Sequence, residues 1–537
     1  MRIYIERMKM IKRIVLAICL SIPLFVSAQQ AKKPVSGWQN LDLKTDSVFG
    51  IGTEKAYNEL LKGKKHTTVL VAVIDGGVDT AHEDLKDVLW INPKEKAGDK
   101  IDNDKNGYAD DVHGWNFIGS AKGNVEFDNL EITRLVRNYK RKFAALDTNK
   151  LTGADVAAFT EYKKLNAEVN EEITKSKQSF TGVNNFKVAL DNILAAIGKK
   201  DPTADELVKY QPKNSVEARV QKTVLSYLPD FKNVSDFKEK EIMPAWDHYN
   251  EQLEYNYNVD FDPRSIVGDN YADVNERFYG NTDITGPNAD HGSHVSGIIG
   301  ANRTNGIGIQ GVADDVRIMG VRTVPTGDER DKDVANAIRY AAANGARVIN
   351  MSFGKSYSYN KKIVDDAVKF AMSKDALIIH AAGNDNNNTE KEHNFPSRVY
   401  EDKSGKAQAW IEVGASGPKD DLTLKADFSN YGKTTVDVFA PGVDINATTP
   451  GSTYALHSGT SMAAPVVAGL AAVIRSYYPK LTALQVKDII LRSVEKVTHK
   501  VTLTEGKESR EVAFDELCLT GGIVNAYNAL KLAANYK

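Results

Sequence analysis

Short apolar runs rich in β-branched residues alternate with helical patterns through the second half of the chain. Apolar strands that alternate with helices are typical of a parallel sheet covered on both faces. The pattern therefore predicts a three-layer α/β/α fold with a mostly parallel central sheet. The expected strands are Val316–Val321, Val348–Met351 and Ala376–His380, and the expected helices are Asp333–Ala343, Lys362–Ser373, Ala483–Val494 and Ile523–Ala534.

Residues 124–283 have a different pattern, with apolar side chains at helical spacing and a break at Asp201-Pro202-Thr203. We expect a large helical insertion here. It either packs on the core as a separate domain or acts as a lid or substrate-selecting element. The apolar positions are Val156, Phe159, Leu165, Val169 and Ile173, followed by Phe186, Leu190, Ile193, Leu194 and Ile197.

Three separated segments bring acid, base and nucleophile chemistry to the chain. Asp75 ends the apolar run that starts at Val69, so it is expected at the carboxyl end of a buried parallel strand, where sites in α/β sheets lie. His291 lies in Asp-His-Gly-Ser-His-Val-Ser-Gly, and Ser461 lies in Ser-Gly-Thr-Ser-Met-Ala-Ala-Pro. A serine hydroxyl is a weak nucleophile that needs a base, and the base needs an orienting group.

The surroundings of Ser461 favour a developing anion. A buried helix is predicted from Val466 to Tyr478, and Pro465 is tolerated if it lies in the first turn, where an N–H has no helical partner. Backbone N–H groups at a helix N-terminus stabilise negative charge. Asn384 follows the strand Ala376–His380 and can offer a side-chain N–H to an oxyanion.

In these motifs, and in their chain order of Asp, His, Ser, the sequence resembles the subtilases, the subtilisin-like serine proteases. The resemblance covers roughly 66–122 and 284–535. It implies a serine endopeptidase that acts on proteins or peptides through an acyl-enzyme. It assigns the orienting carboxylate to Asp75, the general base to His291, the nucleophile to Ser461 and an oxyanion donor to Asn384.

The chain departs from the family pattern at a few small residues. Gly76 stands where Ser or Thr is usual, and Ser293 and Ser296 replace Thr and Ala. We expect backbone N–H groups to replace the hydroxyl that is missing at Gly76. None of the four proposed catalytic residues is replaced, so the pattern favours an active enzyme.

The segment Asp102–Asp111 resembles the start of an EF-hand calcium loop, with oxygen ligands at alternate positions followed by glycine. His113 replaces the usual Glu at the twelfth position, and the alternative is a polar turn. Clustered carboxylates repel each other without a cation, which favours structural calcium. The expected ligands are Asp102, Asp104, Asn106, the Tyr108 carbonyl, and Asp110 or Asp111.

Two further segments carry weaker signals. Ser352, Phe353 and Gly354 follow a predicted strand and match the subtilase segment that lines the substrate cleft, although an ordinary turn gives the same pattern. His294 lies three residues beyond His291, which is also the spacing of a zinc pair. With no third ligand motif nearby, a structural histidine is favoured.

The N-terminus predicts export. A basic region precedes the apolar stretch Ile14–Val26, and Val26-Ser27-Ala28 is a cleavage signal for a signal peptide of residues 1–28. A membrane or lipid anchor at Cys19 is the alternative. Cleavage leaves Cys518 alone, so the mature protein has no internal disulfide. The net charge of −2 gives no reason to expect nucleic acid as a partner, and no further apolar run approaches the length of a membrane span.

The predicted organisation is a lead segment at 29–65, a catalytic domain in two parts at 66–123 and 284–537, and the insertion between them. Periplasm, cell surface and medium are all compatible with export. Three functional alternatives stay open: a processing protease gated by the insertion, a peptide-binding relative without turnover, and an acyl transferase or esterase that uses the same three residues.

Overall fold

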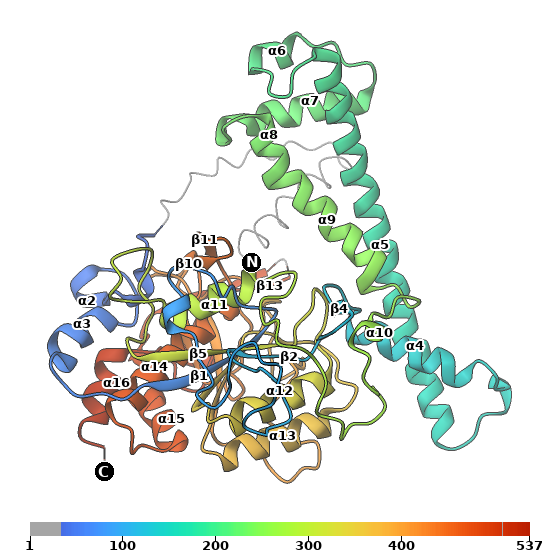
Figure 1. Ribbon diagram of the computed structural model, residues 1–537. Coiled ribbons are helices and arrows are strands. Elements are labelled where there is room, and N and C mark those ends of the chain that lie inside the picture. Colours follow the sequence, from blue (N-terminus) through green and yellow to red (C-terminus); the bar gives the residue numbers. More distant parts are fainter. Residues whose placement is uncertain (1–33, 507, 537) are drawn as a thin grey trace. The chain divides into compact units, whose positions relative to one another are not determined.

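The computed structural model describes residues 34–506 and 508–536, so the predicted signal peptide and Cys19 lie outside the described residues. The chain divides into two compact units (Figure 1). Here the sheet unit denotes the described residues of Lys32–Glu131 and Asp262–Lys537, and the helical unit denotes Ile132–Phe261.

Nine strands of the described residues form the central sheet of the sheet unit. All neighbouring pairs are parallel except β12–β15 at one edge. The three-layer, mostly parallel α/β/α fold expected from the sequence is therefore confirmed. In sheet order the strands are β12 (Glu495–Lys496), β15 (Gly522–Ile523), β9 (Val438–Pro441), β8 (Trp410–Ser416), β7 (Leu377–Ala381), β6 (Val348–Met351), β1 (Val69–Asp75), β5 (Val316–Arg322) and β2 (Gly114–Asn116).

Helices cover both faces of this sheet (Figure 1). Ala72 and Ile74 of β1 share a hydrophobic cluster with α12 (Asp331–Ala343) and α13 (Lys361–Ser373). Since alternate residues of a strand point to opposite faces, the remaining β1 side chains face the other layer. There α11 (Asp290–Gly300) packs on α14 (Thr460–Tyr477), and α14 contacts β1 and β6 to β9.

The rest of the sheet unit consists of short elements around this frame. Residues of the predicted lead segment are part of it, since Trp38 is fully buried and donates its indole N–H to the Val443 carbonyl at 3.1 Å. The additional elements are α2 (Leu43–Asp46), α3 (Thr53–Ala56), α10 (Arg264–Val267), α15 (Ala483–Arg492), α16 (Ala526–Ala533) and the hairpins β3 (Gly119–Ser120)–β4 (Gly123–Asn124), β10 (Ile445–Thr449)–β11 (Thr453–His457) and β13 (Lys500–Glu505)–β14 (Glu508–Ala513).

The helical unit is built around one long helix. The two periodic segments recognised in the sequence belong to the single 44-residue helix α5 (Ala154–Ile197), about 66 Å long at 1.5 Å per residue. The expected helix after Asp201-Pro202 begins at Ala204, where Thr203 forms a capping box with Glu206. The other helices are α4 (Glu131–Phe143), α6 (Ala204–Lys209), α7 (Ser215–Tyr227), α8 (Val234–Phe237) and α9 (Met243–Glu251).

The helical unit is narrower than the insertion of 124–283 expected from the sequence, because 124–131 and 262–283 group with the sheet unit. Backbone hydrogen bonds join Asn281 to Asn116 of β2 in both directions, at 2.9 and 3.0 Å. The indole N–H of Trp115 also donates to the Tyr279 carbonyl at 2.7 Å. These loop residues lack the periodicity of an element, so only their partners identify where they belong.

Two helix starts differ by three or more residues from the sequence-based expectation. Helix α16 begins at Ala526 rather than Ile523, because Gly522 and Ile523 pair as a strand and Asn525 caps the helix. Helix α14 begins at Thr460 rather than Val466, so Pro465 lies inside the helix and not in its first turn. This helix also has the length and apolarity of a membrane span, but 94% of its 18-residue window is buried inside the protein.

A buried ionic cluster holds the segment that follows the helical unit. Arg264 contacts Asp269 and Asp333, each at 2.6 Å, and both carboxylates are fully buried. The neighbouring cations hold the pKa of Asp269 below its usual value despite its burial. Because isolated buried charges are costly, this cluster fixes how 262–269 returns to α12.

We predict that Arg264→Met lowers the free energy of unfolding of the sheet unit by about 3–5 kcal/mol, since it removes the cation from the buried Asp333 carboxylate and leaves Asp269 with Lys332 alone. The control is Lys362→Met, which removes the exposed i,i+4 pair with Asp366 and costs less than about 1 kcal/mol. Denaturant titration of both variants measures the difference. Equal small losses would show that the cluster does not stabilise the unit.

Candidate active site

Asp75 and His291 meet at the end of β1. Asp75 is the last residue of that strand, and its two carboxylate oxygens lie 2.8 and 3.0 Å from His291 Nδ1. The amide of Gly76 donates to Asp75 Oδ1 at 2.7 Å, which is the backbone support expected in place of a hydroxyl. The Asp75 side chain is buried, while the imidazole is 37% exposed and can meet a ligand.

The Asp75 carboxylate sets the protonation of His291. Burial lowers the pKa of this imidazole, but the charge of Asp75 and its hydrogen bond outweigh burial and raise the pKa above the ordinary value. Nδ1 faces a carboxylate, so it carries the proton in the neutral ring. Nε2 is then the basic nitrogen, as a general base requires.

Ser461 is the second residue of α14, as a nucleophile at a helix N-terminus should be. Its hydroxyl donates to the Ser352 carbonyl at 3.0 Å, and within the described residues it makes no hydrogen bond to His291. The packing of α11 on α14 brings the two helices that carry His291 and Ser461 together. The pair Asp75–His291 is thus formed, and the serine is engaged elsewhere.

Asn384 is joined to the residue before the serine. Its Oδ1 accepts hydrogen bonds from the Thr460 amide at 2.8 Å and the Thr460 hydroxyl at 3.1 Å. The Thr460 hydroxyl in turn accepts from the Gly383 amide at 3.1 Å. Thr460 orients the Asn384 amide. Thr460 directly precedes Ser461, and this position is the only sequence signal for its contact with Asn384.

The segment Ser352–Gly354 follows β6, whose neighbours in the sheet are β1 and β7. It therefore lies on the same sheet edge as Asp75 and Asn384. A Cβ at Gly354 would lie 2.2 Å from Asn394 Oδ1, so a side chain here would displace the Asn394 amide, which donates to the Ala381 carbonyl at 3.0 Å.

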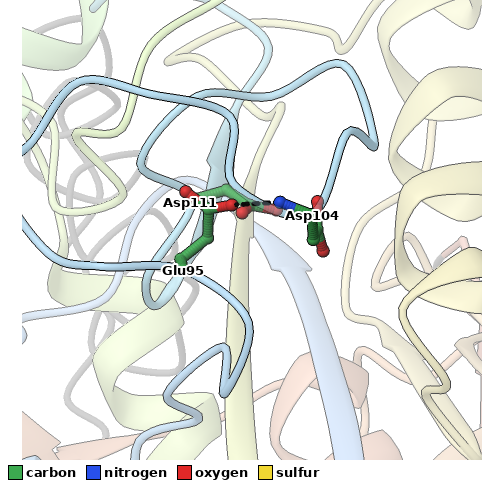
Figure 2. A group of neighbouring side chains, drawn as sticks. All are labelled: Glu95, Asp104 and Asp111. Atoms are coloured by element: carbon green, nitrogen blue, oxygen red, sulfur yellow. Dashed lines mark hydrogen bonds between the residues drawn. The ribbon is translucent and has the colours of Figure 1, made fainter.

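The loop expected to bind calcium brings together a different set of carboxylates. Oxygen atoms of Glu95, Asp104 and Asp111 lie within 4.8 Å of one another (Figure 2). Figure 2 shows the hydrogen bond of the Asp104 amide to Glu95, at 3.1 Å. Glu95 was missed in the sequence because it lies outside the repeating Asp and Asn pattern. Asn106 stays close, since its Nδ2 donates to Asp111 Oδ2 at 2.9 Å.

The other expected ligands mainly shape the loop. Asp102 accepts from the amides of Asn106 and Gly107, at 3.0 and 2.8 Å. Asp110 accepts from the amides of Gly98 and Lys100, at 2.7 and 3.0 Å. The Tyr108 side chain is buried, and its hydroxyl donates to the Arg277 carbonyl at 3.1 Å. Asp111, rather than Asp110, therefore joins the carboxylate group.

Asp111 is the buried member of the group. Burial raises the pKa of its carboxyl to about 6, against hydrogen bonds from Tyr340, Asn106 and Asn92 that favour the charged form. A carboxylate held charged in such a place gains much from a cation. The three oxygens also match the ligand type that Ca²⁺ prefers.

His294 does not belong to either site. Its Nε2 lies 3.1 and 3.0 Å from the carbonyls of Ile445 and Ala455, and its ring stacks on His457 with 4.1 Å between centroids. Burial lowers the pKa of His294 to about 3, so the ring is neutral. Its surroundings fit a structural histidine better than a zinc ligand.

Comparison with known proteins decides the family. The family model of the subtilase family matches residues 66–512, most of this chain. The chain belongs to the subtilase family. The resemblance seen in the sequence motifs is confirmed.

Curated relatives of this subtilase are named as proteases. It is 38% identical over 240 residues to a thermophilic serine proteinase of Bacillus sp. (strain AK1), covering 44% of this chain and 53% of the relative. It is 27% identical over 415 residues to a cell wall-associated protease of Bacillus subtilis (strain 168), covering 76% of this chain and 41% of the relative. The chain thus spans about half the length of these relatives.

Two solved structures superpose on less than half of this chain. One match is to a structure titled as proteases from Pseudoalteromonas arctica PAMC 21717, with 27% identity, a TM-score of 0.38 and coverage of 47% of this chain and 78% of that chain. Another is to a cold adapted subtilisin-like serine proteinase, with 32% identity, a TM-score of 0.34 and coverage of 40% and 72%.

We predict that Gly292→Ala separates His291 from Asp75. A Cβ at Gly292 would lie 2.1 Å from the Gly77 carbonyl oxygen and 3.1 Å from Asp75 Oδ1, so α11 must move away from the end of β1. Because the Asp75 charge raises the pKa of His291, the separation lowers that pKa, which NMR titration of the imidazole measures.

The matched control is Gly417→Ala, whose new Cβ meets its nearest atom at an ordinary 3.4 Å. It should leave the pKa of His291 unchanged. An unchanged pKa in Gly292→Ala would mean that the close approach of α11 to β1 is not needed for the pair.

Proposed function

We propose that this subtilase is an exported serine endopeptidase that hydrolyses peptide bonds through an acyl-enzyme on Ser461. The observation that carries the proposal is the contact of the buried Asp75 carboxylate with His291 Nδ1 at 2.8 Å. This contact orients the ring and stabilises the imidazolium that forms during catalysis. The contact joins two residues that lie 216 positions apart in the chain, in two of the motifs that resemble the family pattern.

In the proposed reaction, His291 Nε2 takes the proton of the Ser461 hydroxyl as the oxygen attacks the scissile carbonyl. The C–O bond to Ser461 forms, and the carbonyl oxygen becomes an oxyanion. The oxyanion then collapses, and the scissile C–N bond breaks as His291 gives its proton to the leaving amine. In the second half, His291 takes a proton from the water that hydrolyses the ester, and Ser461 is released. Before attack, the Ser461 hydroxyl must turn from the Ser352 carbonyl toward His291. Such catalytic hydrogen bonds often form only when substrate is bound.

Asn384 and the Ser461 amide are the proposed oxyanion donors. Since Thr460 holds the oxygen side of the Asn384 amide, we assign the oxyanion to its NH₂ side. The amide of Ser461 belongs to the first turn of α14, where N–H groups have no helical acceptor. Fixed donors of this kind stabilise the charge that develops in acyl transfer.

Ser352, Phe353 and Gly354 form the proposed substrate segment. They continue from β6 at the same sheet edge, so an extended peptide can add beside their backbone as a further strand. This mode recognises main chain, and the substrates are therefore proteins or peptides.

The alternative of a peptide-binding relative without turnover rested on Gly76. The Gly76 amide supports Asp75 directly at 2.7 Å, which removes that argument. A processing protease selected by the helical unit, and an acyl transferase or esterase, use the same residues. They differ from a general endopeptidase only in which acyl donors and acceptors are accepted.

Export follows from the predicted signal peptide and agrees with a relative named as cell wall-associated. Residues 1–28 lie outside the described residues, so this part of the proposal rests on sequence.

We further propose a structural calcium ion at Glu95, Asp104 and Asp111, beside Asn106, whose Nδ2 faces Asp111. Support comes from three carboxylate oxygens within 4.8 Å of one another, one of them buried. The cation would neutralise the cluster and fix the loop between β1 and β2. It would take no part in peptide hydrolysis.

The test of function is labelling with a fluorophosphonate serine-hydrolase probe. The wild-type protein should be labelled, and Ser461→Ala should not. Labelling should rise with pH through an apparent pKa above that of a free imidazole, about 6.5, because only neutral His291 is a base. Asp75→Asn should slow labelling at every pH.

Ser416→Ala is the control, because its hydroxyl is buried on β8 and has no hydrogen-bond partner among the described residues. It should be labelled like the wild type. If neither the wild type nor Ser416→Ala is labelled, the activated-serine proposal is wrong. A digest of unrelated proteins then separates a general endopeptidase from a processing enzyme.

The calcium proposal predicts that EDTA lowers the melting temperature by roughly 5 °C or more, since a ligand at 100 times its Kd stabilises by about 2.7 kcal/mol. Glu95→Gln keeps the size of the side chain but removes its charge, and it should lose most of that calcium effect. Asp366→Asn, on the surface of α13, should keep it. Equal EDTA effects in both variants would place the ion elsewhere.

A further inference from the structure

The helix that carries the nucleophile has a missing hydrogen bond at the nucleophile itself. In an α-helix the N–H of residue i bonds to the carbonyl of residue i−4. Pro465 has no N–H and lies inside α14, so the carbonyl of Ser461 lacks its helical donor. Ser461 is 5% exposed, and an unpaired carbonyl in such a place is costly.

A side chain from the neighbouring sheet edge supplies the missing donor. The Ser352 hydroxyl donates to the Ser461 carbonyl at 2.9 Å. The same hydroxyl oxygen accepts from Asn350 Nδ2, also at 2.9 Å, which directs its only proton toward Ser461. Asn350 is fully buried and Ser352 is 3% exposed, so the bond is protected from water.

The backbone of Ser352 makes a second bond to the same residue. Its carbonyl accepts the Ser461 hydroxyl at 3.0 Å. Ser352 and Ser461 are therefore joined by two hydrogen bonds in opposite senses, one to the main chain of the nucleophile and one to its side chain. Two such bonds fix both the position and the orientation of the first turn of α14.

We propose that Ser352 is a positioning residue for the nucleophile, through a hydroxyl that replaces the helical hydrogen bond lost at Pro465. This inference rests on the proposed role of Ser461. It gives Ser352 a task separate from substrate contact, because substrate addition would use its backbone and positioning uses its hydroxyl. The chain Asn350–Ser352–Ser461 links β6 to the first turn of α14.

The proposal predicts that the need for the Ser352 hydroxyl depends on Pro465. Pro465→Ala restores an N–H that can reach the Ser461 carbonyl. The experiment measures how much Ser352→Ala slows fluorophosphonate acylation, once in the wild-type background and once in the Pro465→Ala background. We expect a loss of about tenfold in the wild-type background, as for one buried hydrogen bond, and less than about threefold in the Pro465→Ala background.

Two further measurements separate positioning from folding and from substrate contact. Melting temperatures of all four proteins report any general loss of structure. For peptide substrates, Ser352→Ala should lower kcat and leave KM within about twofold. Ser352→Thr keeps the donor and should keep the acylation rate within about threefold of wild type, a test that holds even if the proteins that carry Pro465→Ala do not fold.

Each other result overturns a defined claim. Equal losses from Ser352→Ala in both backgrounds, or no loss in the wild-type background, would show that the hydroxyl does not replace the lost helical bond. A raised KM with unchanged acylation would assign Ser352 to substrate contact alone. A wild-type protein that is not labelled would instead overturn the role of Ser461, on which the inference rests.

Discussion

The parallel order of β7, β6 and β1 is the constraint on which the candidate site depends. Parallel strands end at the same edge of a sheet, so three neighbouring strands deliver Asp75, Ser352 and Asn384 to one edge without any special loop. The strands are buried on both faces by helices, and their register is therefore strongly fixed. A shift of one residue in β1 would turn Asp75 toward the opposite face. The packing of the core thus fixes the positions of the residues at this edge.

The two remaining groups come from helices on one face of that sheet, α11 and α14, and each is held by a local exception to helix rules. At α11, Gly292 allows an approach to β1 that a side chain would block. At α14, Pro465 removes a backbone bond and a serine from the sheet replaces it. Both exceptions lower the intrinsic stability of a helix. Local conflicts of this kind are expected where geometry serves a reaction rather than the fold.

Much of this arrangement could be predicted from sequence, and the failures have physical causes. Strand β6 was predicted to the residue and β7 within one, because short apolar runs with sharp ends need no tertiary information. The start of α14 was not, since the first turn at Thr460 and Ser461 makes long-range contacts with Asn384 and Ser352 that no local pattern contains. Glu95 joins the carboxylate group from outside the Asp and Asn repeat, through a fold of the loop that no spacing rule contains. The roles of Asp75, His291, Ser461 and Asn384 stay predictions that the observed geometry supports.

Buried ion pairs lie where the chain leaves the sheet unit and where it returns 130 residues later. Glu131 and Asp262, the residues on either side of the helical unit, each form an ion pair within the sheet unit. Lys355, the residue after Gly354, contacts Glu131 at 3.0 Å, and Arg330 contacts Asp262 at 2.9 Å. The Lys355 and Glu131 side chains are each 1% exposed, and Lys355 also contacts Asp331 at 2.8 Å, so these charges are paired away from water. Such pairs add little net stability compared with apolar packing, but they strongly penalise a wrong arrangement. The two chain segments that flank the helical unit are therefore tied to the loop after β6 and to the start of α12, two elements of the sheet unit.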